Sequence, residues 1–296
     1  MPTYLLQSVF TTLMLFLSLD AVTESVQVID DLGRKVKLSF PAQRIVSLAP
    51  HITENLFAAG IGDLLVGAVT YSDYPEEAKS IPRIGSYNKF NIELILALEP
   101  DLIIAWKEGN QKHQVEKLIE LGLTVYINAP EELNDIAGDI KDFGNLSGKE
   151  ITANIAATSF TSRLNKFRKD FSGKKQISVF YETWHKPLLT VNGQQFIGRI
   201  LKLCSGKNIF SQLDALTPQV SEEAVLAANP EVIIASGHGE ARPEWLDRWR
   251  KWPLLNATKN DHLFFVPPQL IQRHTPRLLE GSQLVCEYLQ QIRNGD

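Results

Sequence analysis

The sequence lacks the charge imbalance that is typical of nucleic-acid-binding proteins. Its 296 residues contain 30 Lys and Arg against 34 Asp and Glu, which gives a formal net charge of −4 at pH 7. A protein that binds a phosphate backbone usually carries a clustered excess of basic side chains. The basic residues of this chain are spread along its length, so we expect no nucleic-acid partner.

The sequence also lacks the short motifs that carry common enzyme chemistry. It contains no G-x-S-x-G nucleophile turn, no H-E-x-x-H zinc motif and no glycine-rich phosphate loop. The stretch "SLAPHITE" follows the first predicted strand of a sheet, where a nucleotide-binding protein would have glycines. Its 6 histidines never cluster at metal-ligand spacing with cysteines or carboxylates. We therefore predict a protein that is not an enzyme and has no dedicated metal site.

A single long apolar run stands at the start of the chain. It extends from Leu5 to Ala21, is too short to span a bilayer comfortably and ends at a small residue. We expect residues 1–21 to be a secretory signal peptide that directs the protein to the periplasm. No Lys or Arg precedes the run, so an uncleaved membrane anchor is the alternative. No Cys follows it, which excludes lipid attachment there.

Cysteine is scarce in this chain, with only Cys204 and Cys286. In an exported protein a pair of cysteines is more often bridged than free. We predict a disulfide between them, and the alternative is two buried free thiols.

Short apolar strands alternate with amphipathic helical segments in both halves of the chain. Examples of strands are "RIVSLAP" near the start and "QISVFYE" in the second half. This alternation favours mostly parallel sheets covered by helices. We predict an α/β fold with two Rossmann-like lobes at residues 22–146 and 173–296. Residues 147–172 contain apolar positions three to five apart and no Pro, which predicts one long helix joining the lobes.

Two stretches, one in each half, repeat the same plan. "NIELILALEPDLIIAW" begins at Asn91 and "SEEAVLAANPEVIIAS" begins at Ser221. In both, a helix-capping residue is followed two positions later by Glu93 or Glu223, and a Pro ends the helix before a strand. A Glu in the first helical turn gains about 0.3–1 kcal/mol from the helix dipole alone. The repeat therefore leaves open a local role or contact with a two-fold symmetric partner.

Several motifs resemble the helical-backbone class of periplasmic substrate-binding proteins of ABC importers, and within it the cobalamin-binding branch. These motifs are "DDLGRKV", "RIVSLAPHITENLFAAG", "YSDYP", "LALEPDLIIAW" and "QRHTPR". The resemblance covers the chain from about Val26 to the last helix. It implies a binding protein that holds a corrinoid in a cleft between its lobes as transported ligand and has no cofactor. The alternative within the class is a siderophore or haem binder.

The same resemblance implies a set of ligand-contacting residues. Tyr71 and Trp106 match aromatic contacts of the family, Tyr87 stands where the family has a tryptophan, and Trp184 is a further cleft candidate. The matched closing loop departs from the family's best-known member, which has an acidic residue at position 269 and an aromatic one at 270. Its candidate contacts are Gln269, Leu270, Ile271, Gln272 and Arg273. Core packing is the alternative for the aromatic residues, and it is what we predict for Trp245, Trp249 and Trp252.

The resemblance also implies a partner in the membrane. We expect a monomer that delivers its ligand to the two-fold permease of an ABC importer in the inner membrane. Glu93 and Glu223 would be the docking charges, one on each lobe. Which corrinoid is preferred stays open, as does the replacement of its lower axial base by His51, His185 or His274.

Overall fold

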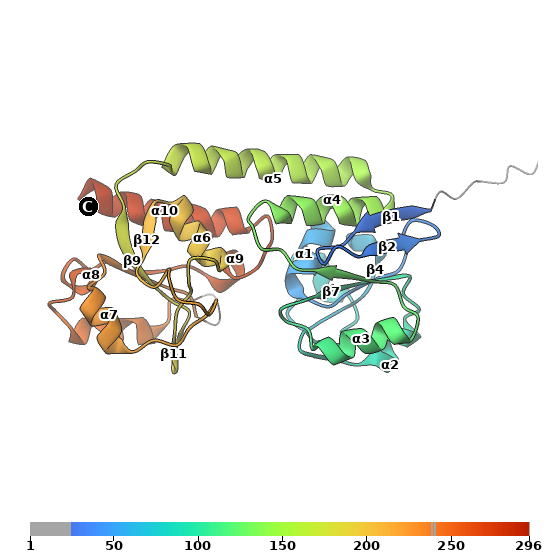
Figure 1. Ribbon diagram of the computed structural model, residues 1–296, viewed down its shortest axis with the longest axis horizontal. Helices are drawn as coiled ribbons and strands as arrows, with labels where there is room; N and C mark the ends of the chain where they lie inside the picture. The colour runs from blue at the N-terminus through green and yellow to red at the C-terminus, as the bar shows by residue number, and fades with distance from the viewer. Residues whose placement is uncertain (1–24, 238, 240, 296) are drawn as a thin grey trace, which may run out of the picture.

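The computed structural model describes residues 25–237, 239 and 241–295 (Figure 1). The predicted signal peptide, residues 1–21, lies outside the described residues. The predicted fold class is confirmed, because two α/β lobes with parallel sheets are joined by the long helix α5 (Glu150–Phe171). None of the helices in the described part of the chain has both the length and the apolar character that a bilayer crossing needs.

The N-terminal lobe contains a parallel sheet of four strands in the order β4-β3-β7-β8. Two antiparallel strand pairs, β1 with β2 and β5 with β6, flank this sheet. The strands are β1 (Val26–Ile29), β2 (Lys35–Leu38), β3 (Ile45–Ser47), β4 (Leu65–Ala68), β5 (Gly85–Ser86), β6 (Lys89–Phe90), β7 (Leu102–Trp106) and β8 (Val125–Asn128). The helices of this lobe are α1 (Pro50–Ala58), α2 (Ile92–Ala97), α3 (Lys112–Glu120) and α4 (Asp135–Ser147), with 3₁₀ turns η1 (Gly62–Leu64) and η2 (Glu76–Ser80).

The C-terminal lobe has the same strand order. Its parallel sheet has the order β12-β9-β13-β14. In each lobe the second strand in chain order therefore forms one edge of the sheet, and the first, third and fourth strands follow it across the sheet. The strands are β9 (Ile177–Glu182), β10 (Trp184–His185), β11 (Leu188–Leu189), β12 (Gly206–Asn208), β13 (Val232–Ala235) and β14 (Leu263–Phe265). The helices are α6 (Phe196–Leu203), α7 (Glu222–Ala228), α8 (Asn256–Lys259), α9 (Pro268–Ile271) and α10 (Leu278–Asn294), with the 3₁₀ helix η3 (Glu244–Lys251).

The repeated helix starts are seen in the structure. The Asn91 side chain accepts a hydrogen bond from the Leu94 amide at 2.9 Å, and the Ser221 side chain accepts one from the Ala224 amide at 3.2 Å. The predicted caps are therefore confirmed. In Figure 1 the two helices that they begin, α2 and α7, lie on the side of the molecule away from α5.

The sequence "HITENLFAAG" by itself predicts a short apolar helix that Thr53 caps and that stops at Gly60, but α1 starts earlier in the structure. The helix begins at Pro50, whose fixed φ suits the first helical position. Thr53 is instead buried inside α1, and its hydroxyl lies 2.9 Å from the hydroxyls of Ser47 and Ser72. The prediction was wrong because the local sequence does not distinguish a threonine that caps a helix from one whose hydroxyl bonds to residues of two other segments.

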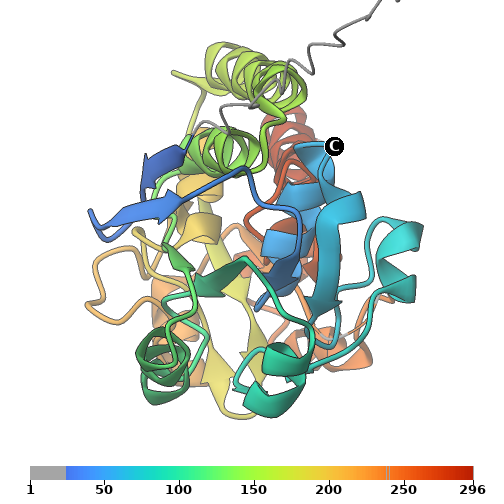
Figure 2. The ribbon, with the colours of Figure 1, turned by 90° about the vertical axis from the view of Figure 1, so that its right-hand side faces the viewer.

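Helix α5 joins the lobes through packing as well as through the chain. A single apolar core runs from the N-terminal lobe along α5 into the C-terminal lobe, where α5 contacts α6 and α10. Figures 1 and 2 show α5 lying along α4 and α10 on one side of the molecule. The α4 contact is close enough that a Cβ at Gly144 would lie 2.2 Å from the Ala153 Cβ. The relative position of the lobes is therefore fixed by a shared core.

The buried face of α5 differs from the one that its large apolar residues suggest. Ala153, Ala157, Phe160 and Leu164 are buried, whereas Ile151 and Ile155 are 80% and 67% exposed. The close approach of α4 selects the small alanines for the contact, and this approach is a tertiary feature that spacing within one helix does not report.

The predicted disulfide is present between Cys204, which follows α6, and Cys286 in α10, with a sequence separation of 82. Closing a loop of this length restricts the unfolded chain. We expect the Cys204→Ala/Cys286→Ala variant to lose about 2–4 kcal/mol of unfolding free energy in urea titrations. Wild-type protein measured after reduction should lose a similar amount. Mass spectrometry that finds two alkylatable thiols in the unreduced protein would contradict the bridge.

Candidate functional site

The two sheets place a set of aromatic and polar residues at their carboxyl ends. Parallel α/β sheets bind ligands there, beside the point where strand order reverses. That point lies between β3 and β7 in the first lobe and between β9 and β13 in the second. Trp106 is the last residue of β7, and Trp184 lies two residues after the end of β9. Two predicted ligand contacts, one in each lobe, therefore lie at or just after the ends of strands that flank the reversal point.

Trp106 and Tyr87 form an aromatic pair in the N-terminal lobe. Their ring centroids are 5.8 Å apart, and the Trp106 ring lies edge-on to that of His51 at 5.1 Å. The Trp106 ring also covers Gly109, where a Cβ would lie only 1.9 Å from the indole. Tyr87 is 39% exposed and Trp106 is half-buried. The pair therefore offers a partly exposed aromatic surface, and the contacts of Trp106 with His51 and Gly109 hold it in place.

Asn110 holds this pair in place, and the sequence analysis did not identify it. Its side-chain oxygen accepts a hydrogen bond from the Trp106 amide at 2.6 Å. Its side-chain nitrogen donates to the carbonyls of Tyr87 at 2.6 Å and Leu48 at 2.9 Å. One buried amide therefore connects three segments. The signal in the sequence is weak, since an Asn after a Gly is more often read as a turn residue.

Two histidines, one from each lobe, lie against each other where the lobes meet. The rings of His51 and His274 have centroids 5.4 Å apart, and Phe196 packs against His274 at 3.9 Å. His51 Nε2 lies 3.0 Å from the Asn128 side-chain oxygen. Burial lowers the pKa of His51 to about 4 and that of His274 to about 3. Both rings are therefore neutral at physiological pH.

The C-terminal lobe supplies a second aromatic group. The rings of Trp184 and His185 are 5.0 Å apart, and Trp245 stacks on His185 at 5.1 Å with an interplanar angle of 14°. The prediction of helix packing fits Trp249, which is fully buried, but Trp252 is 39% exposed. Because Trp245 stacks on His185, it extends the aromatic group at the carboxyl end of β9.

A buried carboxylate ends β9 beside this group. Glu182 is fully buried, accepts a hydrogen bond from Trp249 Nε1 at 2.7 Å and lies 2.6 Å from an Arg248 nitrogen. Burial raises the pKa of Glu182 to about 7, although Arg248 opposes this shift. The sequence analysis missed it, since the only local signal is an acidic residue at the end of an otherwise apolar strand.

The five predicted residues of the closing loop occupy different environments. Gln269 and Leu270 are half-buried in α9, whereas Ile271 is only 1% exposed and packs in the core. Gln272 is exposed, and its side-chain nitrogen donates to the Ser236 hydroxyl at 2.7 Å. Arg273 points to the other lobe, where it lies 2.7 Å from Glu54.

Tyr71, the remaining predicted contact, lies in the other lobe with its side chain 69% exposed. Its φ of 68° is in the left-handed region, which a residue with a large side chain rarely adopts. Such backbone strain is maintained only where the surroundings enforce it.

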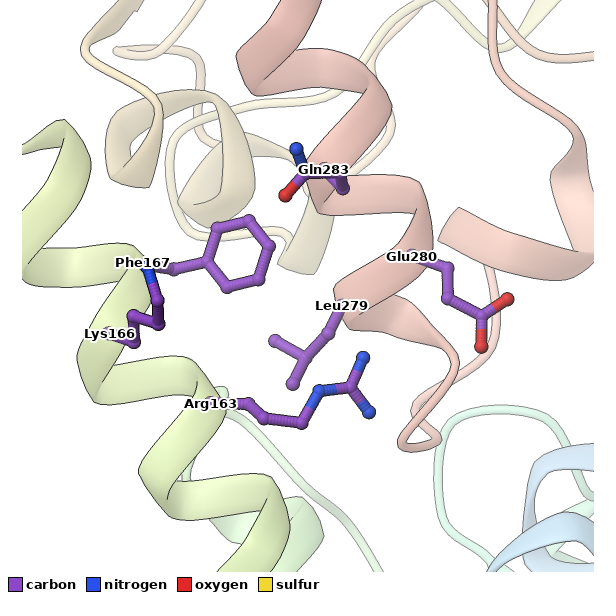
Figure 3. A pocket seen from close by; sticks show the side chains of 6 residues that line it. All are labelled: Arg163, Lys166, Phe167, Leu279, Glu280 and Gln283. Carbon is purple, nitrogen blue, oxygen red and sulfur yellow. The ribbon is translucent and has the colours of Figure 1, made fainter.

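Two hollows lie on another part of the surface. One, of about 380 Å³, lies between α5 and α10, and Figure 3 shows Arg163 and Phe167 of α5 pointing toward α10, which carries Leu279, Glu280 and Gln283. The other, of about 320 Å³, adjoins it and is lined by residues of α1, of α5 and of α10, by the segment before α10, and by Tyr74 and Pro75. No predicted ligand-binding residue lines either hollow.

The histidine pair predicts a pH dependence of stability. Both folded pKa values lie below the ordinary 6.5, so the contribution of the pair is complete above pH 6.5 and is lost as the pH falls toward 4. We expect the His51→Gln/His274→Gln variant to lose less unfolding free energy than wild type between pH 7 and pH 4.5, by roughly 3–5 kcal/mol for the two histidines together. Buried acids with raised pKa, such as Asp139, have the opposite effect in both proteins and cancel in this difference. Equal losses in urea titrations would contradict the prediction.

Comparison with known proteins agrees with this architecture. A family model described as periplasmic binding protein matches residues 45–270. The vitamin B12-binding protein of Vibrio cholerae is 39% identical over 251 residues, which cover 84% of this chain and 90% of the relative. That of Yersinia pestis is 33% identical over 258 residues, covering 86% of this chain and 90% of the relative.

Solved structures give the same result. The periplasmic vitamin B12 binding protein BtuF of Vibrio cholerae superposes with a TM-score of 0.78 at 38% identity, over 84% of this chain and 97% of that one. The periplasmic haem-binding protein RhuT from Roseiflexus has a TM-score of 0.74 at 21% identity, over 83% of this chain and 97% of that one, which shows a common fold. Family match, sequence identity and superposition lead to one conclusion: this chain belongs to the periplasmic binding proteins, a class without enzymatic activity.

Proposed function

We propose that this protein captures cobalamin or a related corrinoid between its two lobes and delivers it to the permease of an ABC importer. The observation that carries the proposal is the presence in each lobe of an aromatic group at the end of a strand that flanks the reversal point, Trp106 with Tyr87 in one lobe and Trp184 in the other. A corrin is a large, flat, rigid ring, and aromatic faces stack well on such a ring. The names of the relatives, vitamin B12-binding proteins, support the same ligand.

The polar residues around the aromatic groups suit the rim of this ligand, which carries neutral amide side chains. Tyr71 and Gln272 are exposed, and Gln269 and Leu270 keep part of their surface. We assign these four to ligand contact, because each has surface to offer. Ile271 is buried and supports the loop from below.

The corrinoid is cargo in this proposal, and the protein needs no cofactor to bind it. We propose export to the periplasm by the N-terminal segment, release as a monomer without a lipid anchor, and docking on a two-fold permease in the inner membrane. Glu93 and Glu223 are exposed residues in the first turns of α2 and α7, which occupy corresponding places in the two lobes. They are the proposed docking charges.

Titration of the purified protein with cobalamin, cobinamide and haemin tests the ligand. We expect saturable quenching of tryptophan fluorescence by the corrinoids, a corrin absorption spectrum that survives dialysis, and recovery of unchanged ligand. Tighter binding of haemin than of both corrinoids would overturn the assignment in favour of a haem binder.

Replacement of Trp106 tests the aromatic surface. We expect Trp106→Ala to weaken corrinoid binding by roughly 1–3 kcal/mol in calorimetric titrations, because the ligand loses a large aromatic contact. Trp252→Ala removes a tryptophan that is 39% exposed elsewhere on the surface and should leave the affinity unchanged. The melting temperature of Trp106→Ala should fall less than that of a variant of buried Trp249. A steep fall in melting temperature with unchanged affinity would show that Trp106 is a core residue.

Replacement of the two glutamates tests docking separately from ligand binding. We expect Glu93→Ala/Glu223→Ala to bind corrinoid normally but to associate poorly with the permease in nanodiscs, since charge pairs at an interface set encounter rate and register. The double change should exceed either single change. Glu150→Ala is the matched control, because Glu150 is an exposed first-turn glutamate on α5. Normal uptake by the double variant would show that both residues only stabilise their own helices through the helix dipole.

A further inference from the structure

Arg273 extends from the C-terminal lobe onto the loop that carries Tyr71. Its Nη1 lies 2.7 Å from both Glu54 Oε1 and Asp73 Oδ1. Its Nη2 donates a hydrogen bond to the Tyr71 carbonyl at 3.0 Å. One guanidinium thus contacts the backbone of a strained residue and a carboxylate two positions away, both in the opposite lobe.

Arg277, four residues further along the chain and just before α10, reaches the same loop. Its guanidinium lies over the Tyr74 ring at 3.9 Å from the centroid, within range of a cation–π interaction. A nitrogen of Arg277 also lies 3.5 Å from Glu54 Oε2. The two arginines therefore share Glu54 and contact the loop at both of its tyrosines.

The loop is held from the inside as well. Ser72 is fully buried, and its hydroxyl bonds to that of Thr53 in α1 at 2.9 Å. Tyr71 is 69% exposed, compared with 44% for Tyr74, although the Tyr71 backbone is held in the left-handed region. The surrounding contacts enforce a conformation that the isolated loop would rarely adopt.

Three of the four charges in this cluster are largely removed from water, whereas Asp73 is 47% exposed. The side chains of Glu54, Arg273 and Arg277 are 2%, 17% and 16% exposed. A buried ion pair contributes little net stability, because desolvation offsets the attraction, but loss of one partner is severe. Such a pair is best understood as fixing a geometry. The geometry fixed here is that of the loop bearing Tyr71 relative to the opposite lobe.

A second ion pair between the lobes serves as a comparison. Arg199 of α6 pairs with Glu132, which precedes α4, and Glu132 is 60% exposed. This pair also joins the two lobes, yet within the described part of the chain neither residue forms a hydrogen bond or ion pair with residues 71–74. It therefore separates simple attraction between lobes from positioning of the loop.

We propose that Arg277, Arg273, Glu54 and Asp73 are positioning residues that clamp the Tyr71 loop of one lobe against the other. The clamp couples the spacing of the lobes to the placement of Tyr71 on the ligand. Arg273 then acts on the loop and not on the corrin, in contrast to the contact that the family resemblance implies. The part played by the ligand rests on the proposed function, whereas the clamp itself exists without ligand.

Dissociation kinetics test the clamp in the loaded protein. We expect Arg277→Met to raise the cobalamin dissociation rate in stopped-flow fluorescence by at least about tenfold, with a smaller change in the association rate. Arg277→Lys keeps a cation near Tyr74 and should restore most of the wild-type rate. Arg199→Met is the matched control and should change dissociation less than about twofold. Equal effects of Arg199→Met and Arg277→Met would overturn the proposal.

A double-mutant cycle shows whether Arg277 acts through Tyr71. If it does, Arg277→Met should have little further effect on the dissociation rate of a Tyr71→Ala protein. Additive effects of the two changes would mean that Arg277 acts on the ligand by another route, which contradicts the clamp.

Hydrogen exchange in the ligand-free protein separates the clamp from the ligand assignment. Amides of residues 71–74 should exchange faster in Arg277→Met and in Glu54→Gln than in wild type, and should be unchanged in Arg199→Met. Asp73→Asn replaces Glu54→Gln if circular dichroism shows that the latter is unfolded. Unchanged exchange in folded clamp variants overturns the clamp, while a wild type that binds no cobalamin overturns only the proposed function.

Discussion

The apolar packing of α5 against both lobes is the constraint on which the rest of the structure depends. Its alanine face approaches α4 so closely that Gly144 is required, and its far half continues the same core into the C-terminal lobe. Protein cores are densely packed and have few alternative arrangements. The two sheets therefore meet at a fixed orientation, and the contacts between His51 and His274 and between Arg273 and Glu54 follow from it.

The shared strand order turns this orientation into a binding arrangement. Each lobe reverses its strand order at the same point. Trp106 ends β7 beside that point in one lobe, and Trp184 follows β9 beside it in the other. Buried polar groups support the aromatic surfaces. Asn110 bonds to the backbone of Trp106 and Tyr87 in one lobe, and in the other Glu182 pairs with Arg248, whose guanidinium lies over the Trp245 ring. In this account, the buried polar groups hold the aromatic side chains in place, and the exposed faces of these side chains bind a large, flat ring.

The features that sequence could predict are those encoded within a short window. Strand and helix alternation, the caps at Asn91 and Ser221, and the disulfide partners all leave local or compositional signals. The features that it missed depend on contacts between distant segments. Asn110 joins residues 48, 87 and 106, and Arg273 reaches residues 54 and 73. The family resemblance supplied the site aromatics, but it gave no indication that an arginine in the loop bonds to the opposite lobe.

The central claim is that the shared core holds the lobes at one spacing, and a distance between α2 and α7 tests it most directly. Ala97 and Ala227 occupy corresponding exposed positions on these helices, and both native cysteines are bridged, so Ala97→Cys/Ala227→Cys allows selective spin labelling. Pulsed electron resonance should give one narrow distance that changes by no more than about 2 Å when cobalamin is added. A broad distribution, or a second population that appears with ligand, would contradict the account.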